Sequence, residues 1–124
     1  MSDGMQRGLD TVSVFIEGIT DAERGSKADK GKPPISLIPR EFLEEVAKAF
    51  GYGAEKHGRH NFRKGLRVSR LLDAAFRHIS ASSNGEDKDP ESGLDHLGHA
   101  GASLAMALFM LKNRPELDDR YKPE

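Results

Sequence analysis

The chain of 124 residues is long enough for one ordinary domain and too short for two full cores. Its 19 Lys and Arg nearly balance 20 Asp and Glu, giving a formal net charge of −1, so neither a bulk electrostatic grip on nucleic acid nor a stable nucleic-acid complex is expected. The absence of Cys excludes disulfides, zinc–thiolate sites and thiol nucleophiles.

The sequence shows neither a secretory signal nor a membrane span. The first 30 residues contain no apolar signal core, and the longest apolar stretch, residues 100–111, is about half the length that a membrane span needs. We therefore expect a soluble, cytoplasmic domain without a membrane partner. Six Phe, two Tyr and no Trp predict only a modest core, so we also expect a homo-oligomer, either a dimer or a tetramer.

Residues 1–38 are predicted to form an N-terminal arm or loop. They are rich in Gly, Ser, Lys and Asp. Apolar side chains alternate over residues 12–16, as in one short strand or in an arm laid on a neighbour. The segment 27–34 is polar and is interrupted by Gly31 and two prolines, which predicts a loop or an extended arm.

Residues 39–112 are predicted to form the helical catalytic core, made of three main helices. Pro39 opens the first helix, because Pro suits the first turn. Apolar side chains then recur at helical spacing, and Gly51 and Gly53 are expected to end or kink the helix. Residues 54–66 are predicted to form a basic, irregular connection between the first and second helices.

Two further helices complete the predicted all-α fold, a helical bundle. The second helix covers roughly residues 68–83, which present one apolar side, and Asn84-Gly85 stops it. The third helix begins at Pro90 and runs to the end of the core. Residues 113–124 then form a charged C-terminal tail.

The predicted third helix has a polar side near its beginning and is apolar all round from residue 100 onward, which implies burial on two fronts. Glu91, Asp95, His96 and His99 form the polar side. Their i,i+3 and i,i+4 spacings allow pairs of side chains to bind one ion. The alternative stays open: the carboxylates serve the helix N-terminus, and the histidines form hydrogen bonds at an interface.

The first predicted helix supplies a second set of charged side chains. Glu41 and Glu45 are spaced i,i+4, and Glu45 and Lys48 are spaced i,i+3. Such residues usually form a solvated charged face. Glu45 is singled out because it borders the side of the apolar stripe that contains Val46 and Ala49.

Charge is strongly segregated along the chain. Residues 55–70 contain six Lys and Arg against one acidic residue, whereas residues 85–95 contain five acidic residues against one Lys. One acidic and one basic pole are typical of a metal–polyphosphate site, in which carboxylates hold the metal and cations cover phosphate oxygens. Oxygen ligands favour Mg²⁺, and histidines favour Mn²⁺ as the alternative. A basic loop neutralised by an acidic loop of the same fold accounts for the composition as well.

Six motifs follow one another along the chain. They are K-x-D-x-G-K-P at 27–33, L-I-P at 37–39, E-V-A-K-A-F-G-Y-G-A-x-K at 45–56, N-F-R-K-G at 61–65, S-R-L-L-D-A-A-F-R-H at 69–78 and G-E-D-x-D-P-E-S-G-L-x-H-L-x-H at 85–99. Together they resemble the MazZ-like dATP/dGTP diphosphohydrolases of phages, a branch of the MazG-like all-α nucleotide pyrophosphohydrolases. The resemblance covers roughly residues 27–111.

This resemblance implies a helical bundle that oligomerises, uses a divalent metal, and cleaves a nucleoside triphosphate to the monophosphate and pyrophosphate. In MazG-like enzymes an E-x-x-E pair on one helix binds the metal. Glu45 takes the second place of that pair, whereas the first place falls near Phe42, so Glu41 or Glu44 must substitute.

An E-x-x-D pair on the next long helix completes the ligand set of the family. Its place falls on His96 and His99 in this sequence, and Glu91 and Asp95, one turn earlier, would supply the missing carboxylates. The residues expected to hold Mg²⁺ or Mn²⁺ are therefore Glu41, Glu45, Glu91, Asp95 and His99.

The predicted function is metal-dependent hydrolysis of dGTP and/or dATP to the monophosphate and pyrophosphate. Glu45 and Lys48 are the expected catalytic residues: Glu45 helps to deprotonate the attacking water, and Lys48 stabilises phosphate charge. The expected substrate-binding residues are Lys27, Asp29, Lys32, Lys56, Asn61, Arg70, Arg77 and His96. Two rival interpretations are a non-catalytic helical module that binds nucleotide or nucleic acid, and a purely structural helical adaptor.

Overall fold

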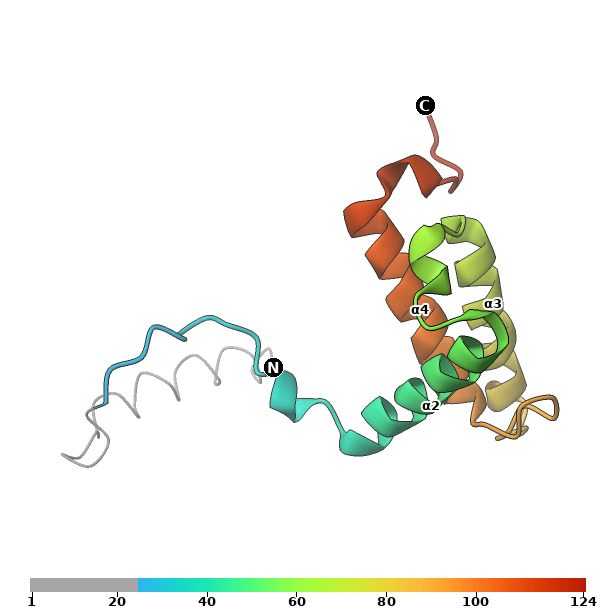
Figure 1. Cartoon of the computed structure of the whole chain (residues 1–124), viewed down its shortest axis with the longest axis horizontal. Coiled ribbons are helices and arrows are strands. Elements are labelled where there is room, and N and C mark those ends of the chain that lie inside the picture. Colours follow the sequence, from blue (N-terminus) through green and yellow to red (C-terminus); the bar gives the residue numbers. More distant parts are fainter. Residues whose placement is uncertain (1–24) are drawn as a thin grey trace. The chain divides into compact units, whose positions relative to one another are not determined.

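The computed structural model describes residues 25–124, so the predicted strand at residues 12–16 lies outside the described residues. The chain divides into two compact units, Met1–Pro34 and Ile35–Glu124. The second unit carries the helices that are labelled in Figure 1. The predicted limits of the catalytic core, residues 39 and 112, stay a prediction.

Three α-helices build the second unit: α2 (Arg40–His57), α3 (Val68–Ser83) and α4 (His96–Asn113). Three short 3₁₀ helices accompany them: η2 (Ile35–Leu37) precedes α2, η3 (Asn61–Lys64) lies between α2 and α3, and η4 (Pro115–Leu117) follows α4. The described residues contain no β-strand, which confirms the predicted all-α class. None of the helices within residues 25–124 has the length and apolar character of a membrane-spanning segment.

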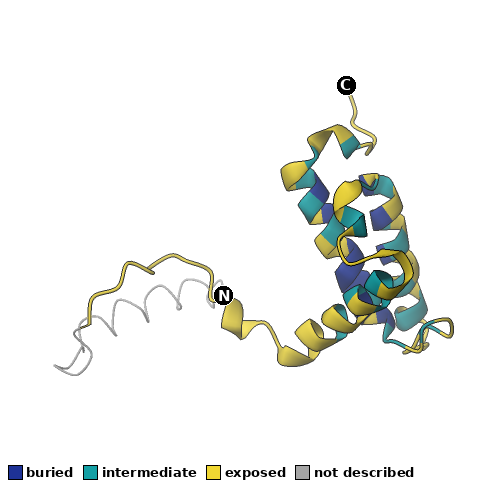
Figure 2. Ribbon diagram, in the orientation of Figure 1, coloured by how far each residue is buried: buried dark blue, intermediate teal, exposed yellow. Residues whose placement is uncertain are grey.

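The hydrophobic core lies between α3 and α4, which run side by side (Figure 1). Val68 and Leu71 of α3 meet Ala107 and Met110 of α4, and all four are buried. Figure 2 shows buried positions concentrated on these two helices. The predicted second helix is confirmed at residues 68–83, because its apolar side faces this core.

Two glycines allow α2 to lie close against α4. A Cβ atom at Gly98 would lie 2.6 Å from the backbone oxygen of Glu45, and one at Gly101 would lie 2.5 Å from a methyl carbon of Val46 and 2.7 Å from the Phe42 ring. Real Cβ atoms do not tolerate such distances, so any larger residue would force the helices apart. This close approach places Glu45 beside the beginning of α4.

Gly51 and Gly53 are predicted to end the first helix or to kink it, and the first of these two expectations is wrong. α2 continues through both glycines to His57 and ends at Gly58, whose φ of +95° favours glycine. The Gly58 N–H donates to the Ala54 carbonyl at 2.8 Å. A glycine in a helix costs only about 1 kcal/mol relative to Ala, which the packing of α2 on α4 outweighs.

The prediction that the third helix begins at Pro90 is also wrong, because α4 begins at His96. Residues 86–95 form a loop closed by its own backbone hydrogen bonds: Gly93 N–H donates to the Asp89 carbonyl at 2.7 Å, and His96 N–H donates to the Asp87 carbonyl at 2.9 Å. Gly93 has a φ of +75°, which no right-handed helix contains. The four predicted polar residues therefore do not share one helix.

The sequence predicts that two sides of α4 are buried, but one of these sides is not covered by residues 25–124. Leu97, Leu104 and Leu108, which share one face of the helix, are 55, 45 and 56% exposed. Phe76 on α3 is 69% exposed. The described part of the chain thus leaves a row of large apolar side chains open to solvent.

The C-terminal tail is fastened to the start of α3 by one carboxylate. Asp119 Oδ1 accepts a hydrogen bond from the Ser69 backbone N–H at 2.9 Å, and Asp119 Oδ2 accepts one from the Ser69 hydroxyl at 2.6 Å. These two bonds satisfy an N–H group in the first turn of α3 that has no partner within the helix. They also lower the pKa of Asp119 below its usual value.

An Asp119→Asn variant is expected to unfold at a lower temperature than the wild type at neutral pH. Because the folded pKa is depressed, the ionised group contributes stability above its unfolded pKa of about 3.9 and loses it as the pH falls through the folded value. Thermal melts recorded as a function of pH should therefore converge in strong acid. Asp118→Asn is the matched control, because Arg120 and Lys122, its ion-pair partners, lie in the same tail. An equal loss of stability in both variants would contradict the role of the Asp119–Ser69 hydrogen bonds.

Candidate active site

A stripe of polar side chains runs along one face of α2. Glu45, Lys48, Tyr52 and Lys56 follow at helical spacing, so they project from the same side. Lys48 Nζ lies 2.8 Å from Glu45 Oε2, and the Glu45 side chain is 24% exposed. The hydrogen bond from Lys48 to Glu45 and the attraction between their charges raise the pKa of Lys48. The pair therefore stabilises the protonated form of Lys48.

The acidic loop between α3 and α4 approaches the C-terminal half of this stripe. Glu91 Oε2 accepts hydrogen bonds from the Tyr52 hydroxyl and from Lys56 Nζ, both at 3.2 Å. The bond to Glu91 is also the main reason why the pKa of Lys56 is raised. The structure thus brings Lys56 and Glu91, both predicted site residues, into direct contact.

The other end of the loop delivers a carboxylate to the N-terminal half of α2. Asp95 is the residue before α4, and its Oδ1 lies 3.3 Å from Lys88 Nζ. Asp95 lines an open cleft of about 530 Å³ together with Glu41 and Glu45. Three carboxylates from two separate elements therefore face one solvent-filled space.

Glu44, the alternative to Glu41 in the family pattern, does not line this cleft. Its Oε2 lies 3.1 Å from Arg40 Nε, and both side chains are largely exposed. Glu41 is therefore the better placed of the two to act with Glu45.

Three histidines gather behind the loop. His96 is buried, its Nε2 lies 2.7 Å from Glu86 Oε1, and its Nδ1 lies 2.8 Å from His78 Nδ1. A neutral His96 that donates through Nε2 to Glu86 has Nδ1 left to accept from His78. His78 also stacks on His99, with ring centroids 4.7 Å apart and planes inclined by 14°.

Burial is the main reason why the pKa of His78 is lowered, with the neighbouring His99 and His96 adding to the effect. His99 Nε2 forms a 2.7 Å hydrogen bond with Ser92 Oγ, and the His99 ring lies edge-on to Tyr52, with centroids 5.9 Å apart. The histidines therefore link α3, the acidic loop and α2 by hydrogen bonds and ring contacts. This is the hydrogen-bonding role that the sequence left as an alternative.

The remaining predicted substrate residues lie elsewhere. Arg70 and Arg77 line a different cleft, of about 350 Å³, with Asp73 of α3 and Ser103 of α4. Asn61 lines an apolar pocket beside the C-terminal half of α2. The structure does not bring these three residues to the carboxylate cleft.

Lys27, Asp29 and Lys32 belong to the first unit. There the Lys32 N–H donates to the Asp29 carbonyl at 3.0 Å in a turn that includes Gly31. Their role in substrate binding stays a prediction.

The donor chemistry of the carboxylate cleft fits Mg²⁺ or Mn²⁺. Within residues 25–124, no three His, Asp or Glu side chains are grouped closely enough to hold a metal ion by themselves. Mg²⁺ rarely needs such a cage, because it is commonly bound by one or two carboxylates, waters and the substrate phosphates. Glu41, Glu45 and Asp95 suit that mode, whereas Glu91 and His99 are engaged with Lys56 and Ser92.

Four residues of this region are not predicted from the sequence as site residues: Tyr52, His78, Glu86 and Lys88. His78 closes the S-R-L-L-D-A-A-F-R-H motif, and Glu86 and Lys88 belong to the acidic loop, but these motifs do not predict their contacts. Nothing in the spacing of residues 78 and 96 predicts that their rings meet, because the contact depends on how α3 packs against α4.

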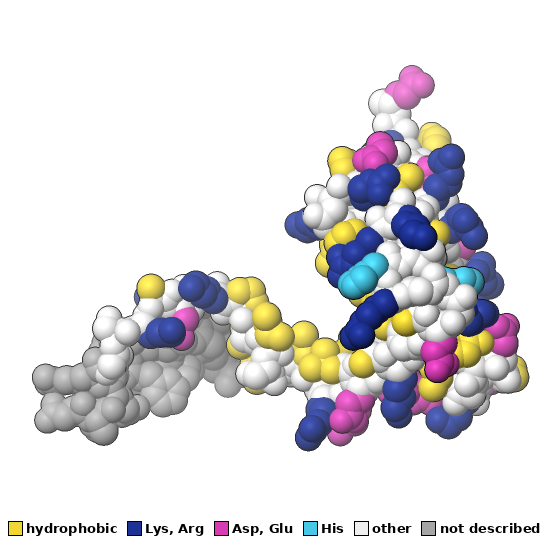
Figure 3. Space-filling view, in the orientation of Figure 1, with side chains coloured by type: hydrophobic (Ala, Val, Ile, Leu, Met, Phe, Trp, Pro, Cys, Tyr) yellow, Lys and Arg dark blue, Asp and Glu magenta, His cyan; other side chains and the backbone are white. Residues whose placement is uncertain are grey.

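Charged side chains of both signs cover the face of the second unit seen in Figure 3. Lys and Arg are interspersed there with Asp and Glu, and histidines lie among them.

The comparison with known proteins assigns the chain to a family. Residues 22–120 match the model of the dATP/dGTP diphosphohydrolase N-terminal family. The chain belongs to this family. A dATP/dGTP diphosphohydrolase of Salmonella phage PMBT28 is 46% identical over 96 residues, which cover 77% of this chain and 33% of that relative. The match thus spans about a third of the phage protein, and no solved structure matches the chain.

Proposed function

We propose that this member of the dATP/dGTP diphosphohydrolase family hydrolyses dGTP and/or dATP to the monophosphate and pyrophosphate with the help of Mg²⁺ or Mn²⁺. The observation that carries the proposal is the cleft in which Glu41 and Glu45 of α2 meet Asp95 at the start of α4. The family match and the name of the phage relative support the substrate class.

The carboxylates of the cleft would hold the cation, and Glu45 has a second task. Its half-buried side chain accepts a proton from the attacking water as a general base. A bound divalent cation supplies positive charge that offsets the negative charge of the phosphates. Glu41 and Asp95 complete the oxygen donors from either side of the cleft.

Two lysines on the same face of α2 would stabilise charge on the phosphate chain. Lys48 and Lys56 both have raised pKa values, so both are cationic near neutral pH. Each forms an ion pair with a carboxylate, Lys48 with Glu45 and Lys56 with Glu91. Exchanging that partner for a phosphate oxygen keeps each ammonium paired.

Product analysis tests the proposed reaction. Incubation with dGTP and with dATP in the presence of Mg²⁺ or Mn²⁺ should release the monophosphate and pyrophosphate, separable by anion-exchange chromatography. Omitting the cation should abolish turnover. Release of orthophosphate, or no turnover of either nucleotide, would reject the reaction and favour the non-catalytic binding module instead.

A second copy of the chain is the proposed cover for the apolar face of α4. Leu97, Leu104 and Leu108 are about half exposed, which is unusual for a row of leucines on a helix that also packs against two others. A homo-oligomer, dimer or tetramer, would bury them. Light scattering of the wild type against Leu104→Glu should show a shift toward monomer; an unchanged mass would contradict this arrangement.

A further inference from the structure

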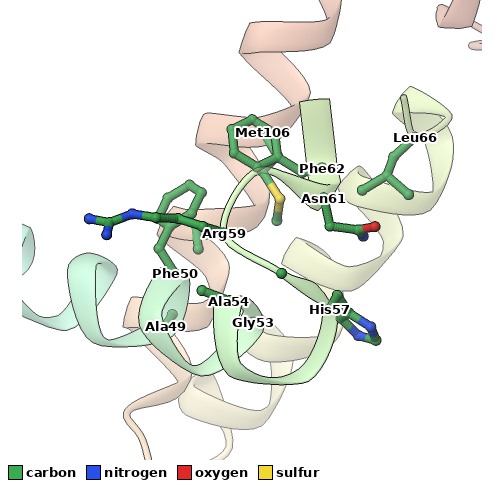
Figure 4. Close-up of a pocket in the computed structure, with 12 residues that line it drawn as sticks. Ala49, Phe50, Gly53, Ala54, His57, Arg59, Asn61, Phe62, Leu66 and Met106 are labelled. Carbon is green, nitrogen blue, oxygen red and sulfur yellow. The ribbon is translucent and has the colours of Figure 1, made fainter. Parts of the chain in front are cut away.

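A small apolar pocket lies between the C-terminal half of α2, η3 and α4 (Figure 4). Its volume is about 160 Å³. Phe50, Phe62 and Met106 supply most of the apolar wall, and Gly53 and Asn61 also line it. The pocket is separate from the carboxylate cleft, yet both are built on α2.

The aromatic walls suit a flat, conjugated guest. The rings of Phe50 and Phe62 lie 5.7 Å apart, centroid to centroid, and are inclined by 60°, and both side chains are only half-buried. The Arg63 guanidinium, also in η3, lies 4.9 Å from the Phe62 ring centroid and forms a cation–π contact with it. Every nucleobase has a π face that stacks on such side chains.

Polar groups stand at the edge of this pocket. The Asn61 amide is one of the polar groups that line it. An amide offers both a donor and an acceptor, the pattern needed to read the edge of a purine. His57 and Arg59 also line the pocket and are exposed. The Arg59 guanidinium adds positive charge near the mouth, which suits a guest that carries phosphates.

We infer that this pocket receives the purine base of the substrate, an inference that rests on the proposed function. The spacing along α2 agrees. Glu45 of the carboxylate cleft and Gly53 of the pocket lie eight residues apart on α2, which corresponds to about 12 Å along the helix axis and a rotation of about 80° around it. One extended nucleotide can bridge such a separation, with the base at Gly53 and the phosphates toward Glu45.

Gly53 leaves the wall of the pocket open. A Cβ atom there would meet nothing within 4 Å, so a larger side chain at this position would find space beside the pocket. Gly51, two residues earlier, has the same open surroundings but does not line the pocket.

Binding measurements on Gly53→Leu and Gly51→Leu test the inference. Two probes are titrated by calorimetry in the presence of Mg²⁺: α,β-methylene dGTP, which resists cleavage between the α and β phosphates, and inorganic tripolyphosphate, which has no base. The Gly53→Leu side chain should fill the pocket and weaken binding of the analogue about tenfold or more, as expected when a base loses its stacking contact. Binding of tripolyphosphate should stay as in the wild type, and Gly51→Leu should change neither.

Circular dichroism melts verify that the variants fold, and Asn61→Ala provides a second variant with the same expected pattern. The inference is overturned if Gly53→Leu and Asn61→Ala bind the analogue as tightly as the wild type. It is also overturned if they lose affinity for both probes equally, or if the wild type binds only tripolyphosphate. A different result would be binding of the analogue that depends on Gly53 in a protein that does not hydrolyse dGTP. That result would reject the proposed reaction but retain the assignment of the pocket to the base.

Discussion

The Glu45→Gln variant is expected to lose at least about 100-fold in kcat for dGTP and dATP while keeping its helical fold. A general base contributes about 10²- to 10⁴-fold, and the amide can neither accept the proton nor offer a cation the same negative charge. The fold should survive because the change keeps the size of the side chain. Its ion pair with Lys48 is partly exposed and contributes little to stability.

The matched control for this variant is Glu44→Gln on the next residue of the same helix. Glu44 pairs with Arg40 and does not line the cleft, so its loss should leave turnover unchanged. Steady-state kinetics of both variants, with thermal melts beside them, make the comparison. Equal activity in Glu45→Gln and the wild type would remove Glu45 from the reaction.

The Gly98→Ala variant is expected to lose both stability and turnover. Its methyl group would lie 2.6 Å from the backbone oxygen and 2.9 Å from the backbone carbon of Glu45, and a backbone cannot rotate away as a side chain can. Overpacking of this kind typically costs about 1–3 kcal/mol. The shift that relieves the clash also moves Glu45 away from Asp95. Both kcat and the free energy of unfolding should therefore decrease.

Gly51→Ala separates this effect from helix propensity. Both positions are glycines inside α-helices, but a Cβ at Gly51 meets nothing within 4 Å. The Gly51→Ala chain should therefore be more stable than the wild type, by about 0.5–1 kcal/mol in urea unfolding, with unchanged turnover. A Gly98→Ala chain that gains stability in the same way would show that α2 and α4 are not in close contact.

A helix can be predicted from the sequence where the local pattern of apolar residues agrees with the way the helix packs. Residues 68–83 present one apolar side and stop at Asn84-Gly85, and α3 has those bounds. The start of α4 does not follow, because Pro90 and Glu91 are typical of a first helical turn, yet the backbone of Gly93 pairs with Asp89 in a loop. The choice between these arrangements depends on hydrogen bonds that the spacing of residues does not record.

The candidate site was predictable in its residue types more than in its contacts. Glu45 stands out in the sequence because it borders the apolar stripe of its helix. In the structure it belongs to α2 and lies against Gly98 of α4. Arg70 and Arg77 are cationic like Lys48, but the rotation of α3 against α4 carries them into another cleft. The spacing of residues along either helix does not record how the two helices are rotated against each other.

The most direct test of the account is the position of the metal in a complex. Crystals of the chain grown with Mn²⁺ and α,β-methylene dGTP would show the cation by its anomalous scattering. The account predicts a Mn²⁺ peak in the cleft between Glu45 and Asp95, within coordination distance of at least one of these carboxylates and of the triphosphate. A peak elsewhere, with Glu45 turned toward bulk solvent and away from the phosphates, would contradict it.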